Sequence, residues 1–309
     1  MLDLHFSPNE PDLFAVAAST GTICLFIVEY RDAEPIRLVK NIEIADTSIL
    51  VLALAWAPPA VETPILAASL SNGRIVMFDY KSPQSTMRTF TGHSLEAWTV
   101  AWSTIAIGPE FVQLYSGGDD SAVCRHNITL NQLSVGGSTN TEQAECRPAS
   151  LDTKIHMAGV TAIIPLFTFD DEKTEFLLTG SYDEYVRVLA IDTSSYSTKF
   201  HVLTEKRLHG GVWRLMDREG SGEEPGGEVT FTVVASCMHA GARILKIRRS
   251  KRGKWTIKVA ARFEEHESMN YASDARFDSD GYSPTFTVVS TSFYDRKLCV
   301  WNFRVHEDS

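Results

Sequence analysis

Apolar and polar residues alternate along the chain in short runs, each about as long as one β-strand. Examples are TVAWS, RIVMFDY, YVRVLAID, RILKI and KLCVWNF, which are rich in β-branched and aromatic residues. A period of two places alternate side chains on opposite faces of a sheet, and the sequence shows no sustained helical periodicity. The pattern therefore predicts an all-β protein.

A tight turn between two such runs recurs six times. The turns are AASTGTICLF, AASLSNGRIVMF, YSGGDDSAVCRH, TGSYDEYVRVL, ASCMHAGARILKI and STSFYDRKLCVW. Their central residues lie 48 to 63 residues apart, at Thr20, Asn72, Asp120, Asp183, Ala240 and Asp295. Repeats of this kind predict a WD40-type β-propeller, in which each repeat builds one blade.

We expect a single domain over residues 1–309, with repeats at about 1–30, 41–80, 88–130, 155–193, 207–248 and 255–304. Because the first repeat starts within its first strand, two alternatives stay open: a ring of six blades, or a sequence that lacks its first blade. Stretches rich in Gly, Ser, Thr and Glu at 134–150 and 218–228 predict surface loops. The basic stretch 248–252, RRSKR, predicts a hairpin tip between two strands.

Charge and cysteine content narrow the function classes. The net charge is −10 and the pI about 5.4, which argues against nucleic acid as a partner, because phosphate binding needs clustered Lys and Arg. The five cysteines include no CxxC pair, so we expect reduced thiols and neither a metal nor a cofactor. Apolar runs fall short of the roughly 20 residues of a membrane span. These features predict a cytoplasmic protein without a membrane partner. We separately expect a monomer.

Several polar and aromatic residues have roles that the repeat itself explains. Buried imidazoles and carboxylates must find hydrogen-bond partners. Two His/Ser-or-Thr/Asp sets fit this structural role, namely His93, Ser116 and Asp120, and His156, Thr179 and Asp183. Four aromatic residues occupy core-strand positions, namely Trp56, Trp102, Trp301 and Phe277.

Other positions are left free by the repeat. The residue before each central turn residue is expected at the mouth of the central channel, and these positions hold Ser19, Ser71, Asp119, Tyr182, His239 and Tyr294. A second free position follows the first strand's His by five residues, and holds Trp98 and Thr161, with Trp213 as their counterpart. So many aromatic side chains around one opening indicate a binding site.

The motifs HSLEAW, YSGGDD, HMAGV, TGSYDE, GGVWR, ASCMHAG and STSFYD, in this order, resemble the WD-repeat diphthine methylesterase family. GGVWR followed by CMHAG is the most specific part, because generic WD repeats require neither. The family has seven blades, and the resemblance places the start of this chain at the second. It implies an enzyme that removes the methyl ester from methylated diphthine on elongation factor 2, so that the final amidation of diphthamide biosynthesis can follow.

The ester hydrolysis that the resemblance implies can be assigned to residues at or near the free positions. Aromatic faces suit the trimethylammonium group of diphthine, which favours Trp98, Tyr182, Trp213 and Tyr294 as substrate-binding residues. His239 is the best general base, and Asp119 or Glu96 would orient it. Cys237 is either a nucleophile or core filler, and no GxSxG elbow occurs. Tyr271 and Asp274, in YASD, match the family's last blade less closely. The alternative is a non-catalytic scaffold that binds a peptide.

Overall fold

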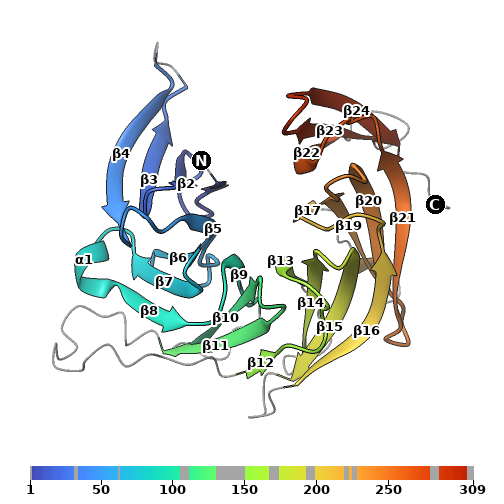
Figure 1. Cartoon of the computed structure of the whole chain (residues 1–309), viewed down its shortest axis with the longest axis horizontal. Helices are drawn as coiled ribbons and strands as arrows, with labels where there is room; N and C mark the ends of the chain where they lie inside the picture. Colours follow the sequence, from blue (N-terminus) through green and yellow to red (C-terminus); the bar gives the residue numbers. More distant parts are fainter. Residues whose placement is uncertain are drawn as a thin grey trace. The chain divides into compact units, whose positions relative to one another are not determined.

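The computed structural model describes residues 2–30, 34–61, 63–104, 111–129, 150–166, 174–192, 199–218, 223–224, 228–278 and 285–304. Their strands form six sheets, in which strands that follow one another along the chain pair side by side (Figure 1). The chain divides into two compact units with three of these sheets each. The first unit is Met1–Ile155 with Asp192–Lys199, and the second is His156–Ile191 with Phe200–Ser309.

The first unit holds three sheets of four strands. The first sheet contains β1 (Asp3–Phe6), β2 (Leu13–Ala17), β3 (Thr22–Val28) and β4 (Ile36–Glu43). The second contains β5 (Val51–Trp56), β6 (Ile65–Leu70), β7 (Arg74–Asp79) and β8 (Arg88–Thr91), with the short helix α1 (Pro83–Thr86) before β8. The third contains β9 (Ala97–Trp102), β10 (Phe111–Gly118), β11 (Val123–Thr129) and β12 (Ser150–Asp152).

The second unit holds the other three sheets. The fourth contains β13 (Val160–Leu166), β14 (Thr174–Ser181), β15 (Tyr185–Asp192) and β16 (Phe200–Arg207). The fifth contains β17 (Arg214–Arg218), β18 (Glu223–Glu224), β19 (Glu228–Ser236), β20 (Ala242–Arg249) and β21 (Trp255–Phe263). The sixth contains β22 (Asn270–Asp278), β23 (Thr285–Ser292) and β24 (Leu298–Arg304).

The sheets extend beyond the strands expected in each repeat. The predicted segment 255–304 gives its first strand, β21, to the fifth sheet, where it pairs with β20. In the same way β8, at the start of the predicted segment 88–130, pairs with β7 of the second sheet. Within the predicted loop 218–228, β18 pairs with β19. Of the predicted loop 134–150, all but Ser150, which begins β12, lies outside the described residues.

The six turns share one backbone feature that confirms their alignment. The residue after each central turn residue has a positive φ: Gly21 (65°), Gly73 (78°), Ser121 (64°), Glu184 (72°), Gly241 (75°) and Arg296 (55°). Glycine adopts this left-handed conformation without steric cost, whereas other residues adopt it only when the surrounding turn requires it. The basic stretch 248–252 likewise forms the predicted hairpin tip between β20 and β21, closed by the Ser250 N–H donating to Lys254 O (2.9 Å).

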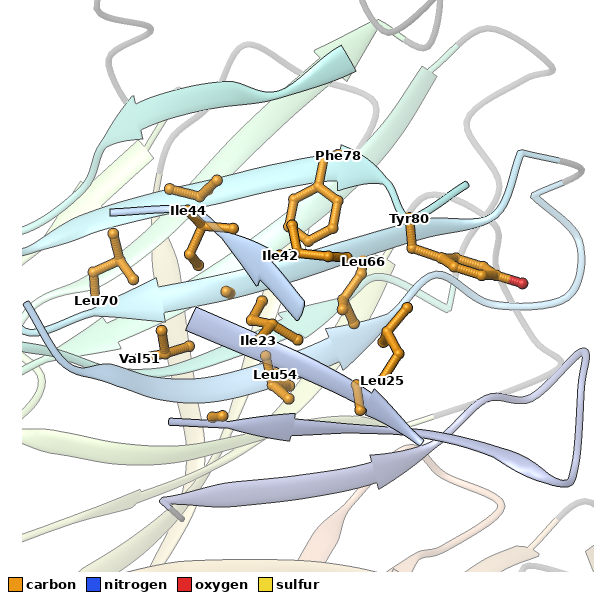
Figure 2. Packing of buried hydrophobic residues seen from close by; sticks show 14 of the residues in the cluster. Ile23, Leu25, Ile42, Ile44, Val51, Leu54, Leu66, Leu70, Phe78 and Tyr80 are labelled. Carbon is orange, nitrogen blue, oxygen red and sulfur yellow. The ribbon is translucent and has the colours of Figure 1, made fainter. Parts of the chain in front are cut away.

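In the first unit, apolar side chains pack between neighbouring sheets. Figure 2 shows side chains of the first two sheets pointing toward one another, among them Ile23, Leu25, Leu54, Leu66 and Phe78. A second cluster joins the second and third sheets. The indole of Trp56 donates to His5 O (2.9 Å), and that of Trp102 donates to Ala55 O (3.0 Å), so each indole links two neighbouring sheets. Both therefore have the packing role that their strand positions predicted.

The second unit is built in the same way. Phe176, Phe231 and Trp255 pack in a cluster shared by the fourth and fifth sheets. Between the fifth and sixth sheets, Trp301 stacks on Phe263 with ring centroids 5.1 Å apart, in agreement with its predicted packing role. The side chain of Phe277, the fourth aromatic residue assigned to the core, lies outside the described residues.

Candidate functional site

The two most specific sequence motifs, GGVWR and CMHAG, pack directly against each other in the second unit. A Cβ atom at Gly210 would lie 2.2 Å from Cys237 O, and one at Gly211 would lie 2.8 Å from Met238 Sδ. The contact at Gly210 is with the backbone, so only glycine permits this approach, whereas a side chain at Gly211 would have to displace the methionine. The Trp213 N–H then donates to Ser236 O (2.8 Å), which fixes the start of β17 beside the end of β19.

His239 lies at the tip of the turn between β19 and β20. Its side chain is exposed and makes no hydrogen bond to any residue that the structure describes. The preceding residue, Met238, has a φ of 42°, which is strained for a bulky side chain, and its backbone pairs with Asn270. Such strain persists only where the surrounding structure holds the residue in place, and strained residues are common at functional sites.

Cys237 faces away from this surface. Its side chain is fully buried, and its thiol lies 3.7 Å from Ala235 O. Burial raises the pKa of the Cys237 thiol to about 12. The nucleophilic form of cysteine is the thiolate, and reactive cysteines have lowered pKa values in partly exposed places. The surroundings of Cys237 are thus those of core filler, one of the two roles that the sequence left open.

Five aromatic side chains form a continuous row in the second unit, which we call the aromatic row. Successive ring centroids are 5.8 Å apart for Tyr182 and Trp213, 5.3 Å for Trp213 and Tyr271, 6.1 Å for Tyr271 and Phe293, and 5.1 Å for Phe293 and Tyr294. Tyr182, Trp213 and Tyr271 are half-buried, whereas Phe293 and Tyr294 are 66% and 72% exposed. The row therefore runs from a partly enclosed end to an open one.

The structure thus brings together three of the four predicted substrate-binding residues and adds two. Tyr182, Trp213 and Tyr294 belong to the aromatic row, while Tyr271 and Phe293 had no role assigned from the sequence. The YASD motif had drawn attention to Tyr271. Phe293 lies just before the predicted mouth position Tyr294, and the repeat pattern assigns no role to it. Its contact with Tyr271 depends on how β22 pairs with β23.

The remaining predicted residues lie in the first unit. The Trp98 indole donates to Asp119 Oδ1 (3.0 Å), so these two predicted mouth positions are in direct contact. The backbone N–H of Asp119 donates to Glu96 O (2.8 Å). The three residues form one local group, in which an aromatic ring lies beside a half-buried carboxylate.

The first His/Ser/Asp set has the buried contacts expected of a structural role. His93 Nδ1 donates to Asp120 Oδ1 (2.9 Å), and its Nε2 lies 2.9 Å from Ser116 Oγ. Burial opposes ionisation of Asp120, but the hydrogen bonds from His93 and the Ser94 N–H outweigh it, and the pKa of the carboxyl falls to about 2. His126 extends the set, with Nε2 3.0 Å from Ser116 Oγ.

The second set differs from the first. Arg187 lies between its members, because its Nη1 atom is 2.9 Å from His156 Nδ1 and 2.8 Å from Asp183 Oδ2. Thr179 donates to the backbone oxygen of Arg187 (3.4 Å). Burial and the Arg187 charge lower the pKa of His156 to about 4. The set is still a buried polar network, but with an arginine that its sequence motif did not indicate.

The sixth sheet has a set that the sequence reasoning missed. His266 Nε2 lies 2.8 Å from Ser290 Oγ, and the Trp301 indole donates to the same hydroxyl (3.2 Å). Ser292 joins His266 Nδ1 (2.9 Å) to Asp295. The available signal was the position of His266 before Asp295, which resembles that of His93 before Asp120.

Within the described ranges, no three His, Cys, Asp or Glu side chains gather as a metal ion would need. The part of the chain that the structure describes also has no helix long and apolar enough to span a bilayer.

Comparison with solved structures shows the fold. A chain of the mitotic checkpoint complex matches with a TM-score of 0.62 and 15% identity, over 98% of this chain and 74% of that one. A chain of the Chaetomium thermophilum Polycomb Repressive Complex 2 bound to GSK126 matches with a TM-score of 0.61 and 14% identity, over 95% and 69%. The chain is an all-β propeller of the WD40 type with six blades, as the turns predicted.

Comparison with curated proteins shows the family, although no protein-family model matches the chain. A Schizosaccharomyces pombe protein named diphthine methyltransferase is 30% identical over 302 residues, which cover 97% of this chain and 78% of the relative. The proteins of the same name from Saccharomyces cerevisiae and Mus musculus are 22% and 25% identical, over 97% and 94% of this chain and 82% and 55% of theirs. The resemblance seen in the motifs is confirmed, and the chain belongs to the diphthine methyltransferase family.

Proposed function

We propose that the chain acts in diphthamide biosynthesis and hydrolyses the methyl ester of methylated diphthine on elongation factor 2. The observation that carries this proposal is family membership, through relatives named diphthine methyltransferase. A methyltransferase in the strict sense needs a methyl donor, whereas hydrolysis needs only water as the second reactant. The product carboxylate would then be the substrate for amidation. The protein would work as a monomer without a cofactor, in the cytoplasm, where elongation factor 2 is found.

His239 is the proposed general base. Ester hydrolysis begins when water attacks the carbonyl carbon, and an imidazole accepts the proton that this water loses. The tetrahedral intermediate then collapses, the bond to the methoxy oxygen breaks, and the same imidazole returns the proton, so that methanol leaves. The exposed position of His239 on a strained turn supports this role, because substrate and water both reach it.

Water is a better candidate for the nucleophile than Cys237. The thiol is fully buried, and burial raises its pKa to about 12, so almost no thiolate exists near neutral pH. The roles predicted for Asp119 and Glu96 in orienting the base, and for Trp98 as a substrate contact, stay predictions. Within the first unit, the Trp98 indole holds the Asp119 carboxylate through a hydrogen bond.

A scaffold function is the second candidate, and one observation favours it. The exposed fractions of Phe293 and Tyr294, 66% and 72%, are large for aromatic side chains and suit docking to a protein surface. A protein that only docks would bind elongation factor 2 without changing it. An enzyme would also dock to elongation factor 2, so binding alone does not distinguish the two functions. Release of product does.

The test is incubation of the purified chain with elongation factor 2 that carries methylated diphthine, without any methyl donor. We expect methanol release and loss of the ester methyl group from the modified peptide in mass spectrometry. His239→Ala should abolish this reaction, Cys237→Ser should keep it, and His201→Ala is the matched control, because His201 is exposed on β16. Binding without methanol release would favour the scaffold, and methyl gain only with an added donor would replace hydrolysis by methyl transfer.

A further inference from the structure

The enclosed end of the aromatic row has the geometry of a partial cage. The rings of Trp213 and Tyr271 meet at 72°, in an edge-to-face arrangement, and Tyr182 is inclined to Trp213 by 35°. Rings that meet at a steep angle form the walls of a corner. All three side chains are half-buried, so the corner is in contact with solvent but not fully open to it.

Backbone contacts from three different sheets hold these rings in place. The Tyr182 N–H donates to Gly159 O (2.9 Å), and the Trp213 N–H donates to Ser236 O (2.8 Å). Tyr271 follows Asn270, which is fully buried and whose side-chain amide donates to Thr291 O (2.9 Å). A site held in this way loses little conformational entropy when it binds a ligand.

A glycine keeps the corner open beside Tyr182. A Cβ atom at Gly211 would lie 3.3 Å from Cδ1 of the Tyr182 ring and 2.8 Å from Met238 Sδ. Any larger residue would push the ring or the methionine from its position. The most specific sequence motif therefore has a physical role in placing the rings, beyond its role in packing the two turns together.

Aromatic faces select a particular kind of cation. The π-electrons give each face a partial negative charge, and Trp and Tyr are the stronger ring types. A primary ammonium group prefers carboxylates and water, because it has N–H bonds to donate. A quaternary ammonium group has none, so ring faces are its natural partners. The net charge of −10 adds a general attraction for cations.

We propose that Tyr182, Trp213 and Tyr271 bind a quaternary ammonium group, and that Phe293 and Tyr294 continue this site toward the surface of the protein that carries the group. The assignment rests on the proposed function only in identifying the group with the trimethylammonium of diphthine. It also predicts a division of labour: the enclosed rings recognise the modification, and the exposed rings contact the surrounding protein.

The first experiment measures binding without any reaction. The full chain is titrated with tetramethylammonium chloride and, separately, with the neutral isostere 3,3-dimethylbutan-1-ol, with NMR detection of the tryptophan indole signals. We expect saturable shifts with tetramethylammonium and much weaker ones with the alcohol. Equal responses to the two probes would overturn the proposal, because the charge would then contribute nothing.

Paired variants separate ring chemistry from packing. Tyr271→Leu should weaken tetramethylammonium binding about 5- to 30-fold, the range expected for loss of one cation–π face, whereas Tyr271→Phe should keep it. Trp213→Leu should act like Tyr271→Leu. Tyr30→Leu is the control, because Tyr30 is 78% exposed and lies in the first unit. If Trp213→Leu fails to fold, the two Tyr271 variants decide; equal affinity in both would overturn the proposal.

The outcome is separable from that of the hydrolysis test. His239→Ala should bind tetramethylammonium as the wild type does, since the probe needs no general base. Probe binding by a chain that releases no methanol would reject hydrolysis and keep the ammonium site. Methanol release by a chain whose Tyr271→Leu variant binds the probe normally would keep hydrolysis and reject the site.

Phe293→Ala and Tyr294→Ala test the open end of the row. Both should weaken tetramethylammonium binding much less than Tyr271→Leu does, and should raise the KM for intact elongation factor 2 more than the KM for a short peptide that carries the same modification. Equal effects on the protein and the peptide would contradict the proposed contact with the surrounding protein.

Discussion

Asp120→Ala removes the carboxylate that closes the turn between β10 and β11. In the wild-type chain, Asp120 accepts hydrogen bonds from His93 Nδ1 (2.9 Å), from the Ser94 N–H (2.8 Å) and from the Ala122 N–H (3.2 Å). The His93 side chain is fully buried, with 0% exposure. The substitution therefore leaves a buried imidazole donor without an acceptor, and we expect the fold to lose stability.

The size of the loss follows from these contacts. A hydrogen bond to a charged group contributes about 1.5–3 kcal/mol, and a stranded buried donor costs about 1–3 kcal/mol. Part of this is offset because Ser94 is exposed and water replaces the carboxylate there. We expect Asp120→Ala to lower the free energy of unfolding by about 2–4 kcal/mol. Asp295→Ala is the matched control at the equivalent turn of the sixth sheet, and its loss should be smaller because Asp295 accepts from the Ser292 hydroxyl and not from a fully buried imidazole.

The assay is urea unfolding followed by circular dichroism, at neutral pH and at stepwise lower pH. The folded-state pKa of Asp120, about 2, lies below the ordinary value of about 4, so its contribution is complete above pH 4 and is lost as the pH falls toward 2. The difference between wild type and Asp120→Ala should shrink in this window. A loss no larger than that of Asp295→Ala, or a difference constant down to pH 2, would refute the reasoning.

Three further outcomes are expected. Burial lowers the pKa of His126 to about 3, while the unfolded chain takes up the proton near pH 6.5. Stability should therefore fall as the pH drops from about 6.5 to about 3, and His126→Gln should flatten that fall in urea midpoints. Gly210→Ala should cost about 2 kcal/mol or more in thermal unfolding, because its Cβ would lie 2.2 Å from Cys237 O, whereas Gly92→Ala, with its nearest contact at 3.5 Å, should be tolerated. Iodoacetamide should label the half-buried Cys299 in the native chain well before Cys237, and equal rates would contradict the burial of Cys237.

The inner strands and turns of the fold were predictable because their signals are local. A strand with one buried face alternates between apolar and polar residues, and a left-handed turn position favours glycine. In the three turns without glycine, the residue at this position follows an Asp. The outer strands gave no such signal. Almost all of Ile36–Glu43 and Phe200–Arg207 is exposed on both faces, so neither strand has an apolar period. Only their pairing with β3 and β15 makes them strands.

The candidate site was predictable in part for the same reason. Tyr182, Trp213 and His239 occupy fixed places in the repeat, and the repeat gives each a position without a packing role. The edge contact between Trp213 and Tyr271 arises where two sheets meet, and a sequence pattern within one repeat carries no information about that. Arg187 shows the same limit of sequence-based prediction. The strand pattern around it does not indicate that its guanidinium lies between His156 and Asp183.

The shared left-handed turn position has a consequence for how this protein tolerates change. Three turns have glycine there, whereas Ser121, Glu184 and Arg296 hold a conformation that costs a side chain about 1 kcal/mol or more. At Glu184, the hydrogen bond that its carboxylate accepts from Arg207 (2.8 Å) offsets part of this cost, and a glycine there would lose that contact. Ser121→Gly and Arg296→Gly would each raise stability by about 0.5 kcal/mol after the entropic cost of glycine. The two glycine substitutions would therefore offset part of the stability lost through destabilising substitutions elsewhere, including those at the aromatic row.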